Sequence, residues 1–277
     1  MTTVRSLLAS HDVPAGDEPR RDAEILLSHL LEKPRAWLYA HSEDEVSDDV
    51  VDAFRSLSQR RAEGVPIAYL IGHREFWTLD LTVTPTVLIP RHDTELLVES
   101  ALRHIPQRSQ CRIVDLGTGS GAIALSLARE RPNSCVVATD VSAEILSVAK
   151  ANAERLGIGN VEFIRGDWFS ALGNVSFDAI VSNPPYIASD DAHLSQSDLR
   201  FEPREALVSG IDGLDSIRQI VRDAPQHLKP GGWLLIEHGF DQGGAVRQLF
   251  AECGFVDIST SRDGEKRERV TAGVQPL

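Results

Sequence analysis

The stretch Ser182-Asn183-Pro184-Pro185-Tyr186 has the side chains best suited to bind a planar amino group. Two consecutive prolines hold the backbone extended and remove two N–H donors, which leaves nearby carbonyl oxygens without competing donors. The side-chain oxygen of Asn183 and the backbone oxygen of Pro184 could accept the two hydrogens of an –NH2 group, while the ring of Tyr186 stacks on its plane. We therefore predict that Asn183, Pro184, Pro185 and Tyr186 bind substrate, and that Asn183, Pro184 and Tyr186 are catalytic. The alternative is a simple turn in which Asn183 only caps and Tyr186 only packs.

A glycine-rich turn at residues 117–121 could hold a nucleotide-like cofactor. It lies between a strand-like run at 113–116 and a helical pattern, and its glycines allow a tight turn and close approach of the backbone to a ligand. Asp140 ends the next strand-like run, where a carboxylate can accept hydrogen bonds from ribose hydroxyls. Trp168 follows the third run, and with Asp140 it would bracket an adenosine, although a packed core tryptophan is equally compatible.

The same spacing of glycines also fits a dinucleotide site, so the turn alone leaves two cofactors open. Asp115, just before the first glycine, would repel a pyrophosphate but would tolerate the sulfonium and ammonium groups of S-adenosylmethionine. This favours S-adenosylmethionine as the cofactor. The pattern by itself assigns the glycines of the turn, Gly117, Gly119 and Gly121, together with Asp140 and Trp168, to this cofactor.

The elements that must position these residues alternate between strand and helix from residue 112 onward. This order predicts an α/β fold with a doubly wound, mostly parallel, seven-strand sheet of the Rossmann-like type. Strands are expected at 113–116, 136–140, 161–164, 177–182, 233–237, 256–261 and 269–274, the last two as an antiparallel hairpin at one edge. A turn is expected at 229–232. The polar connection over 187–213 is long enough to be a lid or a recognition element.

The chain before this region predicts two smaller parts. Residues 1–72 have helical periodicity and no chemical motif, so we expect a helical domain that docks the substrate. Residues 73–92 alternate as strands do and predict a β-hairpin linker, and residues 93–277 would form the domain that binds S-adenosylmethionine. Ser47 is expected to cap one helix, and Asp93 or Thr94 another.

Composition limits the partners of this protein. Hydrophobic residues make up 42% and charged residues 25%, which is typical of a globular chain. The net charge of −13 disfavours a long phosphate-binding groove, so direct nucleic-acid binding is not expected.

No run is long and apolar enough to span a membrane, and the start lacks a signal-peptide core. We expect a cytoplasmic monomer with no membrane contact. The histidines and cysteines lack metal-ligand spacing, so no metal is expected.

The glycine turn together with the Asn-Pro-Pro-Tyr element resembles seven-strand S-adenosylmethionine-dependent methyltransferases that act on amino or amide nitrogens. More narrowly, the sequence resembles the glutamine methyltransferases of peptide chain release factors, the HemK/PrmC family. The narrower likeness rests on residues 72–77, 87–95 and 200–203, and His92 stands where the family usually has proline.

This resemblance covers nearly the whole chain. It implies S-adenosylmethionine as donor, release factors as partners, and the glutamine of their Gly-Gly-Gln loop as acceptor. It also implies that residues 117–121, Asp140, Trp168 and Asn183 contact the cofactor and that residues 183–186 hold the glutamine.

Two other functions fit part of the pattern. An exocyclic amine of adenine or guanine is equally flat, so a nucleic-acid methyltransferase is the alternative enzyme, although it would need a basic surface. A non-catalytic S-adenosylmethionine-binding protein would be expected to have a broken Asn-Pro-Pro-Tyr element, and here the element is intact.

Overall fold

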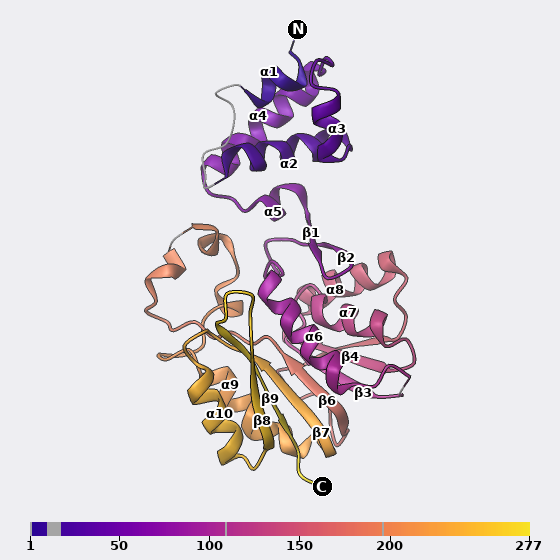
Figure 1. Cartoon of the computed structure of the whole chain (residues 1–277), viewed down its shortest axis with the longest axis vertical. Helices are drawn as coiled ribbons and strands as arrows, with labels where there is room; N and C mark the ends of the chain where they lie inside the picture. The colour runs from indigo at the N-terminus through magenta and orange to yellow at the C-terminus, as the bar shows by residue number, and fades with distance from the viewer. Residues whose placement is uncertain (1, 10–17, 109, 196) are drawn as a thin grey trace. The chain divides into compact units, whose positions relative to one another are not determined.

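Seven strands form one sheet in the order β5-β4-β3-β6-β7-β9-β8. The five strands β3 to β7 pair in parallel, whereas β9 runs antiparallel to both β7 and β8. The sheet is therefore mostly parallel with an antiparallel hairpin at one edge, as the sequence predicts (Figure 1). The strands are β3 (Arg112–Leu116), β4 (Cys135–Asp140), β5 (Val161–Arg165), β6 (Phe177–Ser182), β7 (Leu228–Glu237), β8 (Val256–Arg262) and β9 (Glu268–Val274).

This computed structural model describes residues 2–9, 18–108, 110–195 and 197–277. The chain divides into two units. The first contains the described residues of Met1–His73 together with His193–Phe201, and the second contains Arg74–Ala192 and Glu202–Leu277. A short segment between β6 and α9 thus belongs to the first unit, although the chain on both sides of it belongs to the second.

Helices cover both faces of the sheet in the second unit (Figure 1). Side chains alternate along each central strand, so that Ile113 packs on one face and Val114 on the other. The first face is covered by α6 (Glu95–His104), α7 (Ala122–Glu130) and α8 (Ala143–Leu156), and the second by α9 (Asp215–Asp223) and α10 (Gly243–Glu252). Because both faces are buried, polar groups of the central strands can reach a ligand only at the strand ends.

The first unit is helical. Its helices are α1 (Val4–Leu8), α2 (Pro19–Leu31), α3 (Arg35–Ala40), α4 (Asp48–Ala62) and α5 (Ile67–Ile71). Leu26, Leu27 and Phe54 are fully buried in its core. Within this unit, Arg61 donates to Asp22 at 2.7 Å and to Asp198 at 2.9 Å, which ties the segment His193–Phe201 to the helices.

The expected hairpin is present as β1 (His73–Phe76) and β2 (Leu79–Thr82). From Arg74 onward it belongs to the second unit, and Phe76, Leu79 and Leu81 pack into the core of that unit. Asn152 on α8 accepts from the Thr82 N–H at 2.8 Å and donates to the Thr82 carbonyl at 3.0 Å, so the hairpin is bound to the sheet layer.

One local expectation was wrong, and two were confirmed only in part. The segment at 229–232 is not a turn but the first half of β7, which pairs with β6 through a register shift. Ser47 is the N-cap residue of α4, as expected, but its side chain makes no capping hydrogen bond to the helix. Thr94 is the N-cap residue of α6, also without a side-chain capping bond; it ends a short 3-10 helix, η1 (His92–Thr94), that precedes α6, and the side chains of Asp93 and Thr94 make other contacts.

The long connection after β6 contains three 3-10 helices rather than one regular element. They are η2 (Ala192–Ser195), η3 (Ser197–Phe201) and η4 (Arg204–Ala206). Another 3-10 helix, η5 (Ala224–Gln226), follows α9. The end of this connection returns to the second unit at Glu202, where it forms part of the site described next.

Candidate active site

The register of the parallel strands brings the predicted site residues together. Leu116 pairs with Thr139 on one side and with Ser182 on the other, and Ser182 pairs with Ile236. The residues that follow these pairs, which are Gly117, Asp140, Asn183 and Glu237, therefore lie at the same edge of the sheet.

A cavity of about 450 Å³ lies at this edge, entirely within the second unit. Five of the eight predicted cofactor residues line it: Gly117, Gly119, Asp140, Trp168 and Asn183. Residues 85–88 and the three residues Pro203, Glu205 and Ala206 form further parts of its wall. Within the wall, the Trp168 ring lies 3.4 Å from where a Cβ on Gly117 would be, which is van der Waals contact, and the φ of +72° at Gly117 favours glycine there.

The other three residues of the glycine turn do not line the cavity. The Thr118 hydroxyl donates to Asp115 at 2.7 Å, the Ser120 carbonyl accepts from Asn152 at 3.0 Å, and the Gly121 N–H donates to Thr118 at 2.9 Å. These contacts hold the shape of the turn. Gly119 has a φ of +56° and open space beyond its Cα, so its backbone can lie directly against a ligand.

Asp140 combines contact with the cavity and contact with the turn. Its carboxylate accepts from the Gly119 N–H and from the Ser142 N–H, both at 3.2 Å. Burial raises the pKa of this carboxyl, while those two N–H groups lower it. Each carboxylate oxygen accepts further hydrogen bonds readily, so hydroxyl groups of a ligand in the cavity can be bound here.

Asp115 is fully buried behind the glycine turn. Its Oδ2 accepts from Thr118 and from the Ala124 N–H at 3.2 Å, but Oδ1 has no partner among the described residues. Burial raises its pKa to about 7. A buried carboxyl with an open acceptor favours a cationic ligand nearby and disfavours an anionic one.

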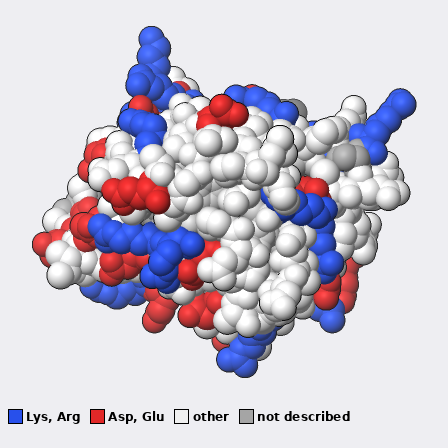
Figure 2. Space-filling model, turned by 90° about the horizontal axis from the view of Figure 1, so that it is seen from below, with Lys and Arg blue, Asp and Glu red and all other residues white. Residues whose placement is uncertain are grey.

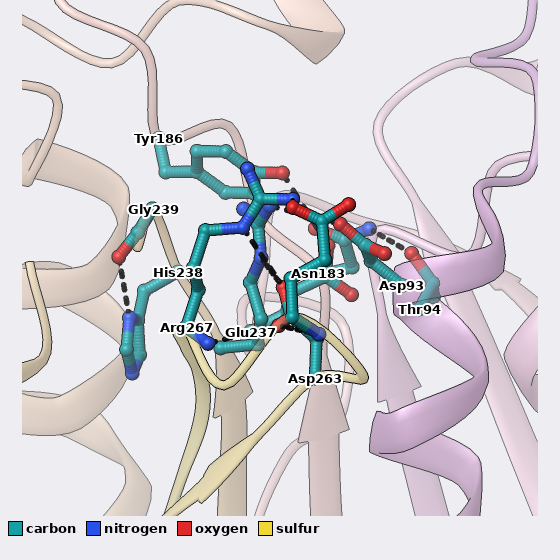
Figure 3. A network of polar contacts seen from close by, with 11 residues as sticks. Asp93, Thr94, Asn183, Tyr186, Glu237, His238, Gly239, Asp263 and Arg267 are labelled. Atoms are coloured by element: carbon teal, nitrogen blue, oxygen red, sulfur yellow. Dashed lines mark hydrogen bonds and ion pairs between the residues drawn. The ribbon is translucent and has the colours of Figure 1, made fainter. Parts of the chain in front are cut away.

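Asn183 has a defined orientation. Its Nδ2 donates to the Thr94 hydroxyl at 3.1 Å, which leaves the side-chain oxygen free, and the residue lines the cavity. Pro185 also lines the cavity, whereas Pro184 is buried. The Tyr186 hydroxyl lies 3.4 Å from Glu237 Oε1 (Figure 3). Burial raises the pKa of Tyr186, so its hydroxyl stays protonated.

Three residues of this site were not predicted as functional. Thr94 binds Asn183, Glu237 lies beside Tyr186, and Glu202 accepts from the Ile89 N–H at 3.1 Å and from Arg91. Glu202 thereby joins two parts of the cavity wall. Glu237 could have been noticed, because it is an acidic residue at the end of an apolar strand, as Asp140 is.

Three further features were examined in the described part of the chain: basic surface patches, metal sites and membrane-spanning helices. On the face shown in Figure 2, Lys and Arg side chains lie among Asp and Glu side chains rather than in one basic patch. Across the described ranges, no group of three or more histidine, cysteine or acidic residues could hold a metal ion. None of the helices in the described part of the chain has the length and apolar character needed to cross a membrane.

A seven-strand sheet of this order, with a glycine turn after β3 and an Asn-Pro-Pro-Tyr element after β6, is the architecture of a Rossmann-like methyltransferase. The structure is similar to that of a methyltransferase from Pyrococcus furiosus, with a TM-score of 0.56, 19% identity, and coverage of 79% of this chain and all of that one. This likeness supports the fold. A family model for the methyltransferase small domain matches residues 93–202, and one for the PrmC N-terminal domain matches residues 2–72.

Relatives that match nearly the whole chain show to which methyltransferase family it belongs. The chain is 53% identical to the release factor glutamine methyltransferase of Xylella fastidiosa (strain Temecula1), over 93% of this chain and 94% of the relative. It is 50% identical to the enzyme of that name from Pseudomonas aeruginosa, over 99% of both chains. This chain belongs to the release factor glutamine methyltransferase family.

The buried Asp115 makes stability depend on pH. Its folded pKa of about 7 lies above the ordinary 3.8, so its contribution to stability is complete below about pH 4 and is lost as pH rises to about 7. Asp115→Asn should flatten the fall in unfolding free energy over this window, by at most about 1.4 kcal/mol per pH unit. Urea titrations of both proteins at several pH values measure this, and identical slopes would contradict the raised pKa.

Proposed function

We propose that this protein transfers a methyl group from S-adenosylmethionine to the side-chain amide nitrogen of the glutamine in the Gly-Gly-Gln loop of peptide chain release factors, and so supports translation termination. One observation carries the proposal: the Asn183 amide is held by Thr94 so that its oxygen is free at the cavity. The family relationship supports the substrate. We expect the protein to act in the cytoplasm as a monomer, without direct nucleic-acid contact.

The cavity suits S-adenosylmethionine. Asp140 would bind the ribose hydroxyls, and Trp168 would flank the adenine. The backbone of Gly117 and Gly119 would lie directly against the cofactor. The open acceptor of Asp115 favours a cation and opposes a pyrophosphate. The cofactor, when bound, supplies an activated methyl group on a sulfonium.

The protein's task is to position a weak nucleophile. The lone pair of a primary amide nitrogen is delocalised into its carbonyl, so the amide reacts only if it is held in line with the methyl group. The Asn183 oxygen and the Pro184 carbonyl would accept the two amide hydrogens. These acceptors also stabilise the positive charge that develops on the nitrogen, and the proton leaves after transfer. Tyr186 would hold the amide plane.

Asn183→Ala tests the role of the free acceptor. By analogy with removal of one donor from an oxyanion hole, kcat should fall roughly 100- to 1,000-fold. Affinity for S-adenosylmethionine should change less, because Asp140 and the glycine turn remain. Single-turnover methyl transfer to a release factor and the melting temperature should be measured on the same preparation. If Asn183 only shapes the turn, the variant will melt lower and keep its full rate, which would overturn this mechanism.

Calorimetry with S-adenosylmethionine, its demethylated product and NAD tests the cofactor. The first two should bind and NAD should not. Asp140→Ala should weaken binding of S-adenosylmethionine by roughly 1.5–3 kcal/mol, the range for hydrogen bonds to a charged group. Asp140→Asn is the matched control, since it keeps one acceptor oxygen and should lose less. Tight NAD binding without S-adenosylmethionine binding would end the methyltransferase proposal.

We propose that residues 1–72 dock the release factor, because this segment carries no chemistry of its own. A truncated chain that starts at Leu70 should bind S-adenosylmethionine normally but show a raised KM for the intact release factor. Its turnover of a short Gly-Gly-Gln peptide should change little, since a peptide is too small to reach a docking surface. Full kcat/KM on the intact release factor would show that the segment does not dock it.

A further inference from the structure

Glu202 is a buried carboxylate beside the cavity, and the proposed reaction assigns it no role. Its side chain is fully buried, which is rare for glutamate unless the carboxylate is paired. One of its oxygens accepts from the Ile89 N–H at 3.1 Å, and the other pairs with the guanidinium of Arg91. Both oxygens therefore have the partners that a buried carboxylate needs.

These contacts join two parts of the cavity wall that are distant in the sequence. Residues 85–88 line the cavity and end just before Ile89. Glu202 lies 113 residues from Ile89, so no local turn holds the two parts together. Three residues that follow Glu202 also line the cavity, namely Pro203, Glu205 and Ala206.

The wall segment, residues 202–208, is fixed at its other end as well. The N–H of Ile187, which directly follows the Asn-Pro-Pro-Tyr element, donates to the Leu207 carbonyl at 2.9 Å. Ile187 and Val208 also form a parallel bridge. The wall segment therefore runs from Glu202 to the predicted substrate element, and Glu202 fixes the end opposite the bridge.

We propose that Glu202 is a positioning residue for the cofactor: by pairing with Arg91 and with the Ile89 N–H, it keeps both parts of the wall ordered before S-adenosylmethionine binds. This inference rests on the proposed function, in which S-adenosylmethionine occupies the cavity. Glu202 does not touch the cofactor in this scheme and acts through the wall residues next to it. A site that is formed in only a fraction of the molecules has an apparent Kd raised by the inverse of that fraction.

Glu202→Gln is the direct test, because it keeps the shape and one acceptor oxygen but removes the charge that pairs with Arg91. In calorimetry, the Kd for S-adenosylmethionine should rise about 10-fold, as expected if the ordered wall is present in about a tenth of the molecules. At saturating cofactor kcat should fall less than this, because bound cofactor restores the wall. An unchanged Kd would overturn the proposal.

Asp178→Asn is the matched control within the same unit. Asp178 lies at the start of β6, at the end of that strand away from Asn183. Like Glu202, it binds one backbone N–H and one cation, since it accepts from the Arg112 N–H at 2.7 Å and pairs with Lys229 at 2.7 Å. Asp178→Asn should lower the melting temperature and leave the Kd for S-adenosylmethionine unchanged. An equal rise in Kd in both variants would show that general loss of stability weakens binding, and would overturn the positioning role.

Amide hydrogen exchange locates the part of the protein that loosens. Without cofactor, Glu202→Gln should speed exchange in residues 85–89 and 202–208, whereas Asp178→Asn should not, because exchange reports local opening. Addition of S-adenosylmethionine should restore most of the protection in Glu202→Gln. Wild-type exchange at these residues in cofactor-free Glu202→Gln would contradict the role of Glu202 in ordering the wall.

Arg91 gives a second route that does not depend on how Glu202→Gln folds. Arg91→Met removes the cation and leaves the Ile89 N–H as the partner of Glu202, so the Kd for S-adenosylmethionine should rise. Arg91→Lys keeps a positive charge, though not the planar fork of arginine, and should recover part of the affinity. Wild-type affinity in Arg91→Met would overturn the proposal. If the wild type itself binds no S-adenosylmethionine, the proposed function fails instead.

Discussion

The hydrogen-bond register of the parallel strands is the constraint on which this site depends. Since β3, β4, β6 and β7 run in the same direction and pair in step, their carboxyl ends meet at one edge of the sheet. Helices bury both faces, so the strand interiors must be apolar and the polar residues collect at the ends. The glycine turn, Asp140, Asn183 and Glu237 are neighbours for this reason, although long stretches of sequence separate them.

Burial then decides what these polar groups can do. Asp115 and Glu237 lie where water cannot solvate a charge, and burial raises the pKa of each to about 7. Each of these carboxyls lowers the stability of the fold at neutral pH, and each has one buried oxygen without a hydrogen-bond partner among the described residues. Asn183, by contrast, is only partly buried and lines the cavity. Its orientation follows from its contact with Thr94, which accepts from its Nδ2 at 3.1 Å.

The connection between β6 and α9 belongs to both the fold and the site. Its middle, His193–Phe201, packs in the first unit through Asp198 and Arg61, whereas Glu202 anchors its end to Ile89 and Arg91 in the second unit. Pro203, Glu205 and Ala206, which follow at once, line the cavity. One continuous segment thus carries residues of the helical unit and of the cavity wall, which gives a physical basis to the Arg-Phe-Glu-Pro likeness at 200–203.

The sequence by itself determined the elements whose cause is local. Strand-like runs that alternate with helical patterns predicted the sheet, and the glycines at 117, 119 and 121 predicted the turn, because each pattern acts over a few residues. Only the tertiary structure decided which residues meet. Thr94 binds Asn183 from 89 residues away, and Glu202 binds Ile89 from 113 residues away. It also showed that Thr118, Ser120 and Gly121 shape the turn without lining the cavity. Contacts at such separations follow from strand register and helix packing, which no short window of sequence contains.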